Sequence, residues 1–443
     1  MQPTDPSPRR PRVLVLSLDM LGARMAGIAI RAAETARALA PYADVTIAAA
    51  RQADEPAPLD VPVVTYHRHD GGTLAPHLES VDAVICQPQW PSVMRALERS
   101  GARLIFDLSG PEVIETIESH RGAPLRRQRL ANAFVTDRLV EALRIGHHFV
   151  ASSDRQLDLW LGTMIGARLL RPEAYDADPA FADRMALVPS GLPDEPPQPT
   201  GTRGARDRFG LGDDDEVVLW TSAVWPWLDA ETPIRAMALL AERRPSARLV
   251  FMARQDRAIG QDAAAQAEQL ATQLGLAGSH VFFNDGWVAY DERADWLLNA
   301  DCAVSCHLPS LETRFSWRTR YLDCFWAGLP IVCTRGEVLA DRVERDDLGA
   351  TVPERDPDAV AVALEGVLER GRRAYGPRLA AVADELRWSR ATAPLARFVC
   401  DTPLPNRLGA GARRRPGHAF RDLAYRAARA PLNAVGKRDW PRL

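Results

Sequence analysis

The residues best suited to chemistry lie between positions 300 and 334. Two apolar runs, 302–305 and 330–334, flank a segment that we predict to be a helix over 317–327, with Ser316 as its N-cap. A helix start offers unpaired amides and the positive end of the helix dipole, which suit a diphosphate. Arginines add planar cationic forks, and this segment supplies Arg314, Arg318 and Arg320.

One carboxylate, Asp323, falls two turns into the predicted helix. There it can accept a pair of hydrogen bonds from vicinal hydroxyls. Arg320 stands three residues before it, so the two side chains can equally form an ordinary ion pair along the helix. The spacing leaves both interpretations open.

A metal site is the second chemistry to consider, because Cys302, Cys306 and His307 are close in sequence. Cys302 begins an apolar strand, however, and no second cysteine pair follows at zinc spacing. We therefore interpret the cysteines as buried core residues and predict no metal site.

Continuous apolar runs in the first half of the chain predict a parallel sheet that is covered on both faces. They alternate with helical patterns at 28–39 and 125–145, which is the order of an α/β fold. The predicted strands span 12–18, 45–49, 82–86, 103–106 and 148–152.

A second α/β series follows a segment with five prolines between 188 and 202. Its first predicted helix spans 231–243. Two doubly wound halves place a functional cleft between them, outside the carboxyl ends of the strands. The predicted strands of this half span 217–221, 248–252, 281–283, 302–305 and 330–334.

These elements divide the chain into two Rossmann-like domains, 12–190 and 213–400, with a hinge linker at 191–212. We predict that the second domain ends in a returning C-terminal helix. Residues 1–11 contain four prolines and are predicted to be disordered, and residues 401–443 form a basic tail.

Charge and composition exclude several classes of protein. The 443 residues carry 58 acidic and 55 basic side chains, a formal charge of −3, which argues against a nucleic-acid binder. The only lysine is Lys437, so an anion site must use arginine, backbone amides or helix ends. Six cysteines and the absence of an apolar leader lead us to expect a cytoplasmic protein.

The tail has its own charge pattern. Ten cations against two acids give residues 407–443 a charge of +8. Phe420, Leu423, Ala424 and Ala427 recur at helical spacing, so a short amphipathic helix can form there. The tail is either solvated or makes a weak peripheral contact with the inner face of the membrane.

The segment 323–334 resembles the C-terminal signature of glycosyltransferase family 4, the retaining nucleotide-sugar enzymes with the GT-B fold. In that family a helix carries a glutamate, followed by small residues, Gly-Leu-Pro and a hydrophobic strand. Here the sequence is Asp323-Cys-Phe-Trp-Ala-Gly-Leu-Pro-Ile-Val-Cys-Thr334. The resemblance covers roughly residues 12 to 400, with further matches at 27–31, 188–191 and 286–290.

The sequence departs from the family in two places. The family's two acids stand eight positions apart, whereas Glu312 and Asp323 stand eleven apart. The family's Arg and Lys on the donor diphosphate are absent from residues 221–229. We therefore predict that Arg318 or Arg320 replaces that pair.

The resemblance implies two doubly wound domains that face each other across a cleft and transfer a sugar with retention, without a metal or cofactor. It makes Glu312 and Arg318 candidate catalytic residues and assigns Asp323 to the donor ribose. The acceptor is a saccharide or a lipid-linked acceptor, as in polysaccharide or glycolipid assembly, with Arg31 and Asp107 on its side of the cleft. The donor-binding residues are Gly27, Trp225, Arg314, Arg320 and Asp323.

Two alternatives keep the fold and change the function. Because the basic pair is missing, the protein can instead be a catalytically weak nucleotide-sugar-binding member. The fold also includes nucleotide-sugar epimerases.

Overall fold

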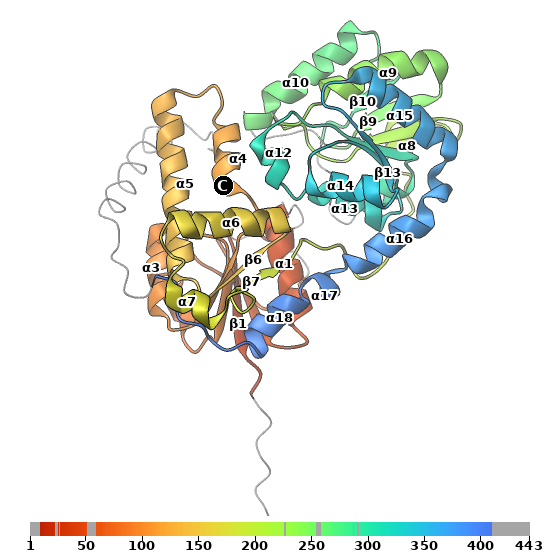
Figure 1. Ribbon diagram of the computed structural model, residues 1–443. Coiled ribbons are helices and arrows are strands. Elements are labelled where there is room, and N and C mark those ends of the chain that lie inside the picture. The colour runs from red at the N-terminus through yellow and green to blue at the C-terminus, as the bar shows by residue number, and fades with distance from the viewer. Residues whose placement is uncertain are drawn as a thin grey trace, which may run out of the picture. The chain divides into compact units, whose positions relative to one another are not determined.

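The computed structural model describes residues 9–22, 25, 27–50, 59–225, 227–253, 258–286, 288–289 and 292–409. Its described residues form two compact units (Figure 1). The first unit holds the chain up to Val113, Arg129–Ser190 and the segment that starts at Trp388. The second holds Ile114–Gln128 and Gly191–Arg387.

The first unit is built on seven parallel strands in the order β3-β2-β1-β4-β5-β6-β7. Alternate residues of β1 pack into two separate clusters, Val13 and Val15 on one face and Leu14 and Leu16 on the other. Both faces of the sheet are therefore covered, as the unbroken apolar runs predict. The strands are β1 (Arg12–Ser17), β2 (Asp44–Ala49), β3 (Val63–Thr65), β4 (Ala83–Cys86), β5 (Arg103–Asp107), β6 (His148–Ala151) and β7 (Met185–Leu187).

Helix α1 (Gly27–Leu39) packs on this sheet through the fully buried Ala29, Ala33 and Ala36. These small residues recur at helical spacing and let the helix approach the strands closely. Helices α4 (Glu112–Ser119) and α5 (Leu125–Ile145) each include residues grouped with the second unit. The other helices of the first unit are α2 (Ala75–Leu78), α3 (Pro91–Arg99), α6 (Asp154–Gly166), α7 (Pro172–Ala177), α17 (Trp388–Ala391) and α18 (Ala393–Cys400).

The second unit is built on six parallel strands in the order β10-β9-β8-β11-β12-β13. The strand order reverses between β8 and β11, and in an open α/β sheet such a switch point opens a crevice at the carboxyl ends. The strands are β8 (Glu216–Trp220), β9 (Ala247–Phe251), β10 (Val281–Phe283), β11 (Cys302–Ser305), β12 (Ile331–Thr334) and β13 (Gly349–Val352).

Most helices of the second unit contribute buried side chains to one continuous core with this sheet. The helices of this unit are α8 (Ala205–Phe209), α9 (Glu231–Arg243), α10 (Ala258–Gln273), α11 (Arg293–Leu298), α12 (Leu311–Phe315), α13 (Thr319–Trp326), α14 (Val338–Arg345), α15 (Pro357–Arg370), the 3-10 turn η1 (Arg372–Ala374) and α16 (Gly376–Glu385). Among the described helices, none combines the length and the apolar character needed to cross a bilayer.

The predicted α/β fold with two doubly wound sheets is confirmed. One local prediction is wrong: Ser316 does not cap the helix that follows it. The Ser316 hydroxyl donates to the Glu312 carbonyl at the end of α12, and Arg318 is the N-cap residue of α13. The residues directly before Ser316 form the short helix α12, which the sequence pattern does not predict.

The unit boundaries differ from the predicted ranges. The segment predicted as a hinge linker, 191–212, packs on the second unit: the Leu192 amide donates to the Leu386 carbonyl, and Trp326 Nε1 donates to the Glu195 carbonyl. Residues 388–400 group with the first unit rather than with the second. The reason is that the apolar face of α18, with Leu395 and Phe398, is buried in a first-unit cluster.

Both termini were predicted to lie outside the domains. Residues 1–8 and 410–443, with the predicted amphipathic helix, lie outside the described residues. The described ends make contacts: Arg9 pairs with Asp82 at 2.8 Å, and Arg407 donates to the Glu98 carbonyl at 2.9 Å. Leu408 is buried in the first unit.

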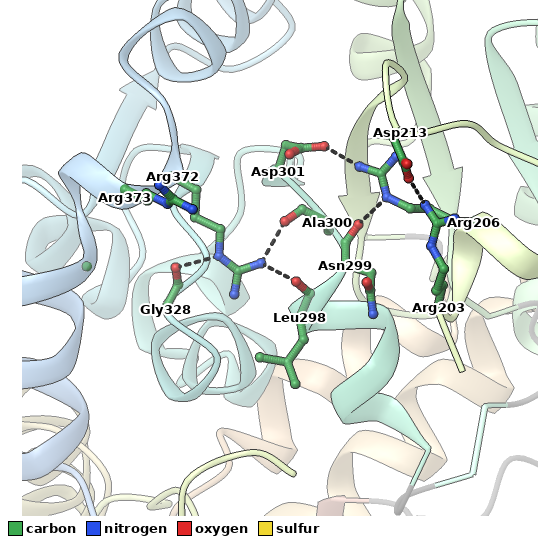
Figure 2. A pocket seen from close by; sticks show the side chains of 11 residues that line it. Arg203, Arg206, Asp213, Leu298, Asn299, Ala300, Asp301, Gly328, Arg372 and Arg373 are labelled. Atoms are coloured by element: carbon green, nitrogen blue, oxygen red, sulfur yellow. Dashed lines mark hydrogen bonds and ion pairs between the residues drawn. The ribbon is translucent and has the colours of Figure 1, made fainter. Parts of the chain in front are cut away.

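Arg372 joins two helix ends in the second unit (Figure 2). Its guanidinium donates to the carbonyls of Leu297, Leu298 and Ala300 around the end of α11 and to those of Ala327 and Gly328 at the end of α13. The last carbonyls of a helix have no partner within the helix. One partly buried cation therefore satisfies the ends of two helices.

We expect Arg372→Ala to lower the free energy of unfolding by about 3 kcal/mol, because several buried carbonyls lose their donor. Urea unfolding followed by circular dichroism measures this. The neighbouring Arg373 is exposed, so Arg373→Ala is the matched control and should change stability by less than about 0.5 kcal/mol. Equal stability of the two variants would show that Arg372 does not hold the helices together.

Candidate functional site

The candidate site lies at the carboxyl edge of the second sheet, where β8 and β11 meet. Main-chain hydrogen bonds join the segments that follow the two strands: the Asp229 amide donates to the Cys306 carbonyl at 3.0 Å, and the Leu308 amide donates to the Trp227 carbonyl at 3.2 Å. Because these hydrogen bonds join the two segments, the segments form one continuous surface at the switch point.

Arg318 is the central cation of this edge. Its Nη2 donates to Glu312 Oε2 at 2.7 Å, and its main-chain amide donates to Glu337 Oε1 at 3.0 Å. The side chains of Arg318 and Glu312 are 11% and 4% exposed. Within the described part of the chain, Nε of Arg318 has no hydrogen-bond partner. The guanidinium is thus held in place by Glu312, and its buried Nε hydrogen has no partner among the described residues.

Glu312 is fixed from two sides. The Ser316 hydroxyl shares its one proton between the Glu312 carbonyl and Oε1, from which it lies 2.8 Å, while Arg318 donates to Oε2. The Ser310 hydroxyl accepts the Thr313 amide and so caps α12, the helix that carries Glu312.

Glu337 is a member of the cluster that the sequence did not single out. It is fully buried and caps α14, accepting the amides of Leu339 at 2.7 Å and Ala340 at 3.0 Å in addition to that of Arg318. Burial raises the pKa of Glu337 to about 7. The signal available in the sequence was an acid between a glycine and an apolar helical run.

His307 was considered only as a metal ligand, and the structure gives it a different environment. It follows β11, its side chain is fully buried, and neither ring nitrogen has a hydrogen-bond partner within the described residues. Burial, followed by the positive charge of Arg318, lowers the pKa of His307 to about 3. The imidazole is therefore neutral at physiological pH.

The metal interpretation has little support in this geometry. Cys302 and Cys306 are both buried in the core, and burial raises the pKa of the Cys306 thiol to about 12. Within the ranges that the structure describes, no three His, Cys, Asp or Glu side chains are grouped so as to hold a metal ion.

Asp323 is engaged on both oxygens. Arg320 Nη1 donates to Oδ2 at 3.0 Å, and Arg293 Nε donates to Oδ1 at 3.3 Å. The ion pair along the helix, one of the two interpretations of this spacing, is therefore present. Arg293 also lies over the ring of Trp326 at 4.6 Å. A ligand hydroxyl at Asp323 has to share the carboxylate with two arginines.

Two other predicted donor-binding residues, Trp225 and Arg314, have different surroundings from each other. Trp225 and Trp227 stack on each other, with ring centroids 5.0 Å apart and planes 13° from parallel. One face of Trp225 is therefore covered by protein. Arg314 is exposed on α12, 5.5 Å from the Phe315 ring.

In the first unit, the two predicted acceptor-side residues bind each other. Arg31 on α1 donates through Nη2 to Asp107 Oδ1 at 3.0 Å, at the carboxyl end of β5. The same guanidinium donates to the Val188 carbonyl at 2.7 Å and to the Ser190 hydroxyl at 3.2 Å. The pair is buried and joins α1 to the edge of the first sheet.

Gly27 is the first residue of α1, and a Cβ at this position would meet no atom within 4 Å. Contacts within the protein therefore do not require a glycine here. The prediction that Gly27 lets a donor diphosphate approach the backbone closely concerns a ligand, so the contacts within the protein do not test it.

Comparison with known proteins shows similarity in the second unit. Residues 215–370 match a family model described as Glycosyl transferases group 1, and this range runs from β8 to α15. D-inositol 3-phosphate glycosyltransferase 2 of Catenulispora acidiphila is 29% identical over 227 residues, 50% of this chain and 51% of the relative. The chain spans about half the length of the curated relatives it matches.

Solved structures match over most of the chain. Anabaena HepE in complex with UDP and glucose superposes with a TM-score of 0.64 at 14% identity, covering 88% of this chain and 99% of that one. The fold is GT-B. An alpha,alpha-trehalose-phosphate synthase (UDP-forming) from Burkholderia xenovorans, in complex with glucose-6-phosphate, matches with a TM-score of 0.62, 14% identity and the same coverage.

The raised pKa of Glu337 gives the stability a defined pH dependence. A folded pKa of about 7, above the usual glutamate pKa of 4.5, means that the contribution is complete below about pH 4.5 and is lost as pH rises through about 7. The loss is at most about 3 kcal/mol.

Glu337→Gln stays neutral at every pH, so we expect the stability of the wild type to fall relative to this variant between pH 5 and pH 8.5. Urea unfolding at half-unit pH steps measures the difference. Glu344, exposed on the same helix, provides the control Glu344→Gln, which should run parallel to the wild type. Parallel curves for Glu337→Gln as well would contradict the role assigned to its burial.

Proposed function

We propose that the protein is a nucleotide-sugar-dependent glycosyltransferase that binds its donor at the β8/β11 edge of the second unit. The observation that carries the proposal is the buried Arg318, held by Glu312 and Glu337 at the switch point. This cluster lies inside the range that matches the glycosyltransferase family model, and its chemistry suits the diphosphate of a nucleotide sugar.

Arg318 performs the charge stabilisation in this proposal. When the bond between the sugar and the diphosphate breaks, negative charge grows on the leaving oxygen. A guanidinium already fixed by Glu312, in surroundings that exclude water, stabilises that charge without reorganising. No protein nucleophile is proposed, and the transfer proceeds with retention.

The donor and acceptor classes follow from the similar proteins. HepE is known in complex with UDP and glucose, and the trehalose-phosphate synthase is UDP-forming, so UDP-hexoses are the first donors to test. The curated relatives are named for D-inositol 3-phosphate, which joins saccharides and lipid-linked saccharides as a candidate acceptor. Arg31 and Asp107 stand at the carboxyl edge of the first sheet, the edge proposed for the acceptor.

One observation favours the second candidate function, a weakly catalytic or inactive nucleotide-sugar-binding protein. Both oxygens of Asp323 are occupied by arginines, and residues 221–229 lack the family's basic pair. A site in this state can hold a donor without turning it over.

An assay of nucleoside diphosphate release decides between these functions. We expect release from one UDP-hexose in the presence of an acceptor, with the product showing the donor's anomeric configuration by NMR. Donor binding without release with any acceptor would favour the binding protein. Interconversion of the sugar without an acceptor would identify an epimerase.

Arg318 variants test the residue that carries the mechanism. We expect Arg318→Ala to lower kcat/KM by at least about 100-fold, the scale for losing one charge-stabilising donor. Because removing a buried cation also destabilises the fold, Arg318→Lys, which keeps the charge and loses the fork, is assayed beside it. Arg345, exposed on α14, gives the control Arg345→Ala. Full activity in both Arg318 variants would remove Arg318 from the mechanism.

A further inference from the structure

A pocket lies at the opposite edge of the second sheet from Arg318 (Figure 2). Its volume is about 570 Å³. Asp301, which directly precedes β11, and Gly328, which follows α13 and precedes β12, both line it. The strands are parallel, so their starts lie at the amino edge and their ends at the carboxyl edge. The pocket is therefore separate from the proposed donor site.

Arginine dominates the charge of this pocket. Its charged lining consists of four arginines and two aspartates, namely Arg203, Arg206, Arg372, Arg373, Asp213 and Asp301. The excess of two positive charges lies within a space of ligand size, because small-molecule sites commonly measure about 300–1,000 Å³. A dianion of modest size matches both the charge and the volume.

Two of the arginines are fixed and form the wall. Arg206 donates to Asp301 Oδ2 at 2.9 Å and to the carbonyls of Asn299, Gly212 and Asp215. Arg372 is held by the five carbonyls at the ends of α11 and α13. Because these guanidinium groups are anchored, they hold positive charge at the pocket without any ordering when a ligand arrives.

The other two arginines are available to a ligand. The exposed side chain of Arg373 has no hydrogen-bond or ion-pair partner among the residues that the structure describes. The side chain of Arg203 pairs with Asp213, and these two side chains are 44% and 89% exposed. An ion pair so open to solvent is worth little, so an anion can take Arg203 at a small loss.

The start of α16 adds to the same positive field. Gly376, the first residue of this ten-residue helix, lines the pocket, and a helix start carries the positive end of the helix dipole. Arginine forks bind phosphate oxygens in pairs, which a point charge does not do.

We propose that this pocket binds a phosphate group, either free or carried by a small metabolite, and that Arg203 and Arg373 are its ligands. The site does not depend on the proposed glycosyltransferase activity. Gly328 follows the carboxyl end of α13, and Arg318 is the N-cap of the same helix, so an occupied pocket and the proposed donor site would be joined by one helix.

Isothermal titration of the full chain with inorganic phosphate, glucose 6-phosphate and AMP tests the proposal, with glucose as the uncharged control. We expect at least one phosphate-bearing probe to bind with a Kd below 1 mM, while glucose does not bind. Tighter binding of the organic phosphates identifies a metabolite as the ligand, and binding of inorganic phosphate with equal affinity identifies the free anion.

Variants place the binding in the pocket. Arg203→Ala/Arg373→Ala should weaken the Kd at least tenfold without a change in melting temperature, because both side chains are exposed. Arg243→Ala is the matched control, since the Arg243 side chain is also 44% exposed and in a surface ion pair. Arg318→Lys should bind the probe as the wild type does, whatever its transferase activity. Absence of binding by every phosphate-bearing probe, or unchanged affinity in the double variant, would overturn the proposal.

Discussion

The burial of Arg318 is the constraint on which the candidate site depends. A guanidinium taken out of water is tolerated only where charged and polar groups replace its hydration. Here Glu312, from the segment after β11, accepts a hydrogen bond from the guanidinium. Glu337, from the segment after β12, accepts one from the main-chain amide of the same residue. One residue therefore fixes two neighbouring loops at the sheet edge.

A single arginine also holds the other end of α13. Arg372 closes the carboxyl end of that helix with five carbonyl contacts, while Arg318 stands at its amino end. In a chain whose only lysine is Lys437, arginine serves as structural staple and as candidate ligand alike. An arginine can play both parts because its planar group carries five hydrogen-bond donors, of which several can bind protein groups while others remain available to a ligand.

The sequence predicts the strands well because continuous apolar runs reflect burial on both faces, a local property. Thus β8, β10 and β11 lie within one residue of their predicted positions. It predicts Glu312 and Arg318 as site residues, and the structure brings them together. It misses the helix α12, which is five residues long and has too short a pattern to be recognised.

Long-range partners are the part that sequence reasoning could not supply. Glu337 meets Arg318 across 19 positions, and Arg293 meets Asp323 across 30. The isolation of the His307 ring is likewise a property of packing rather than of neighbouring residues. The basic pocket was missed for the same reason, because Arg203 and Arg373 come from opposite ends of the second unit.

The most direct test of the central claim is a crystal structure of the full chain with a nucleoside diphosphate such as UDP. The account predicts that the diphosphate lies at the β8/β11 edge with a phosphate oxygen within hydrogen-bond distance of the Arg318 guanidinium. A diphosphate bound elsewhere, with Arg318 in contact only with Glu312 and Glu337, would contradict it.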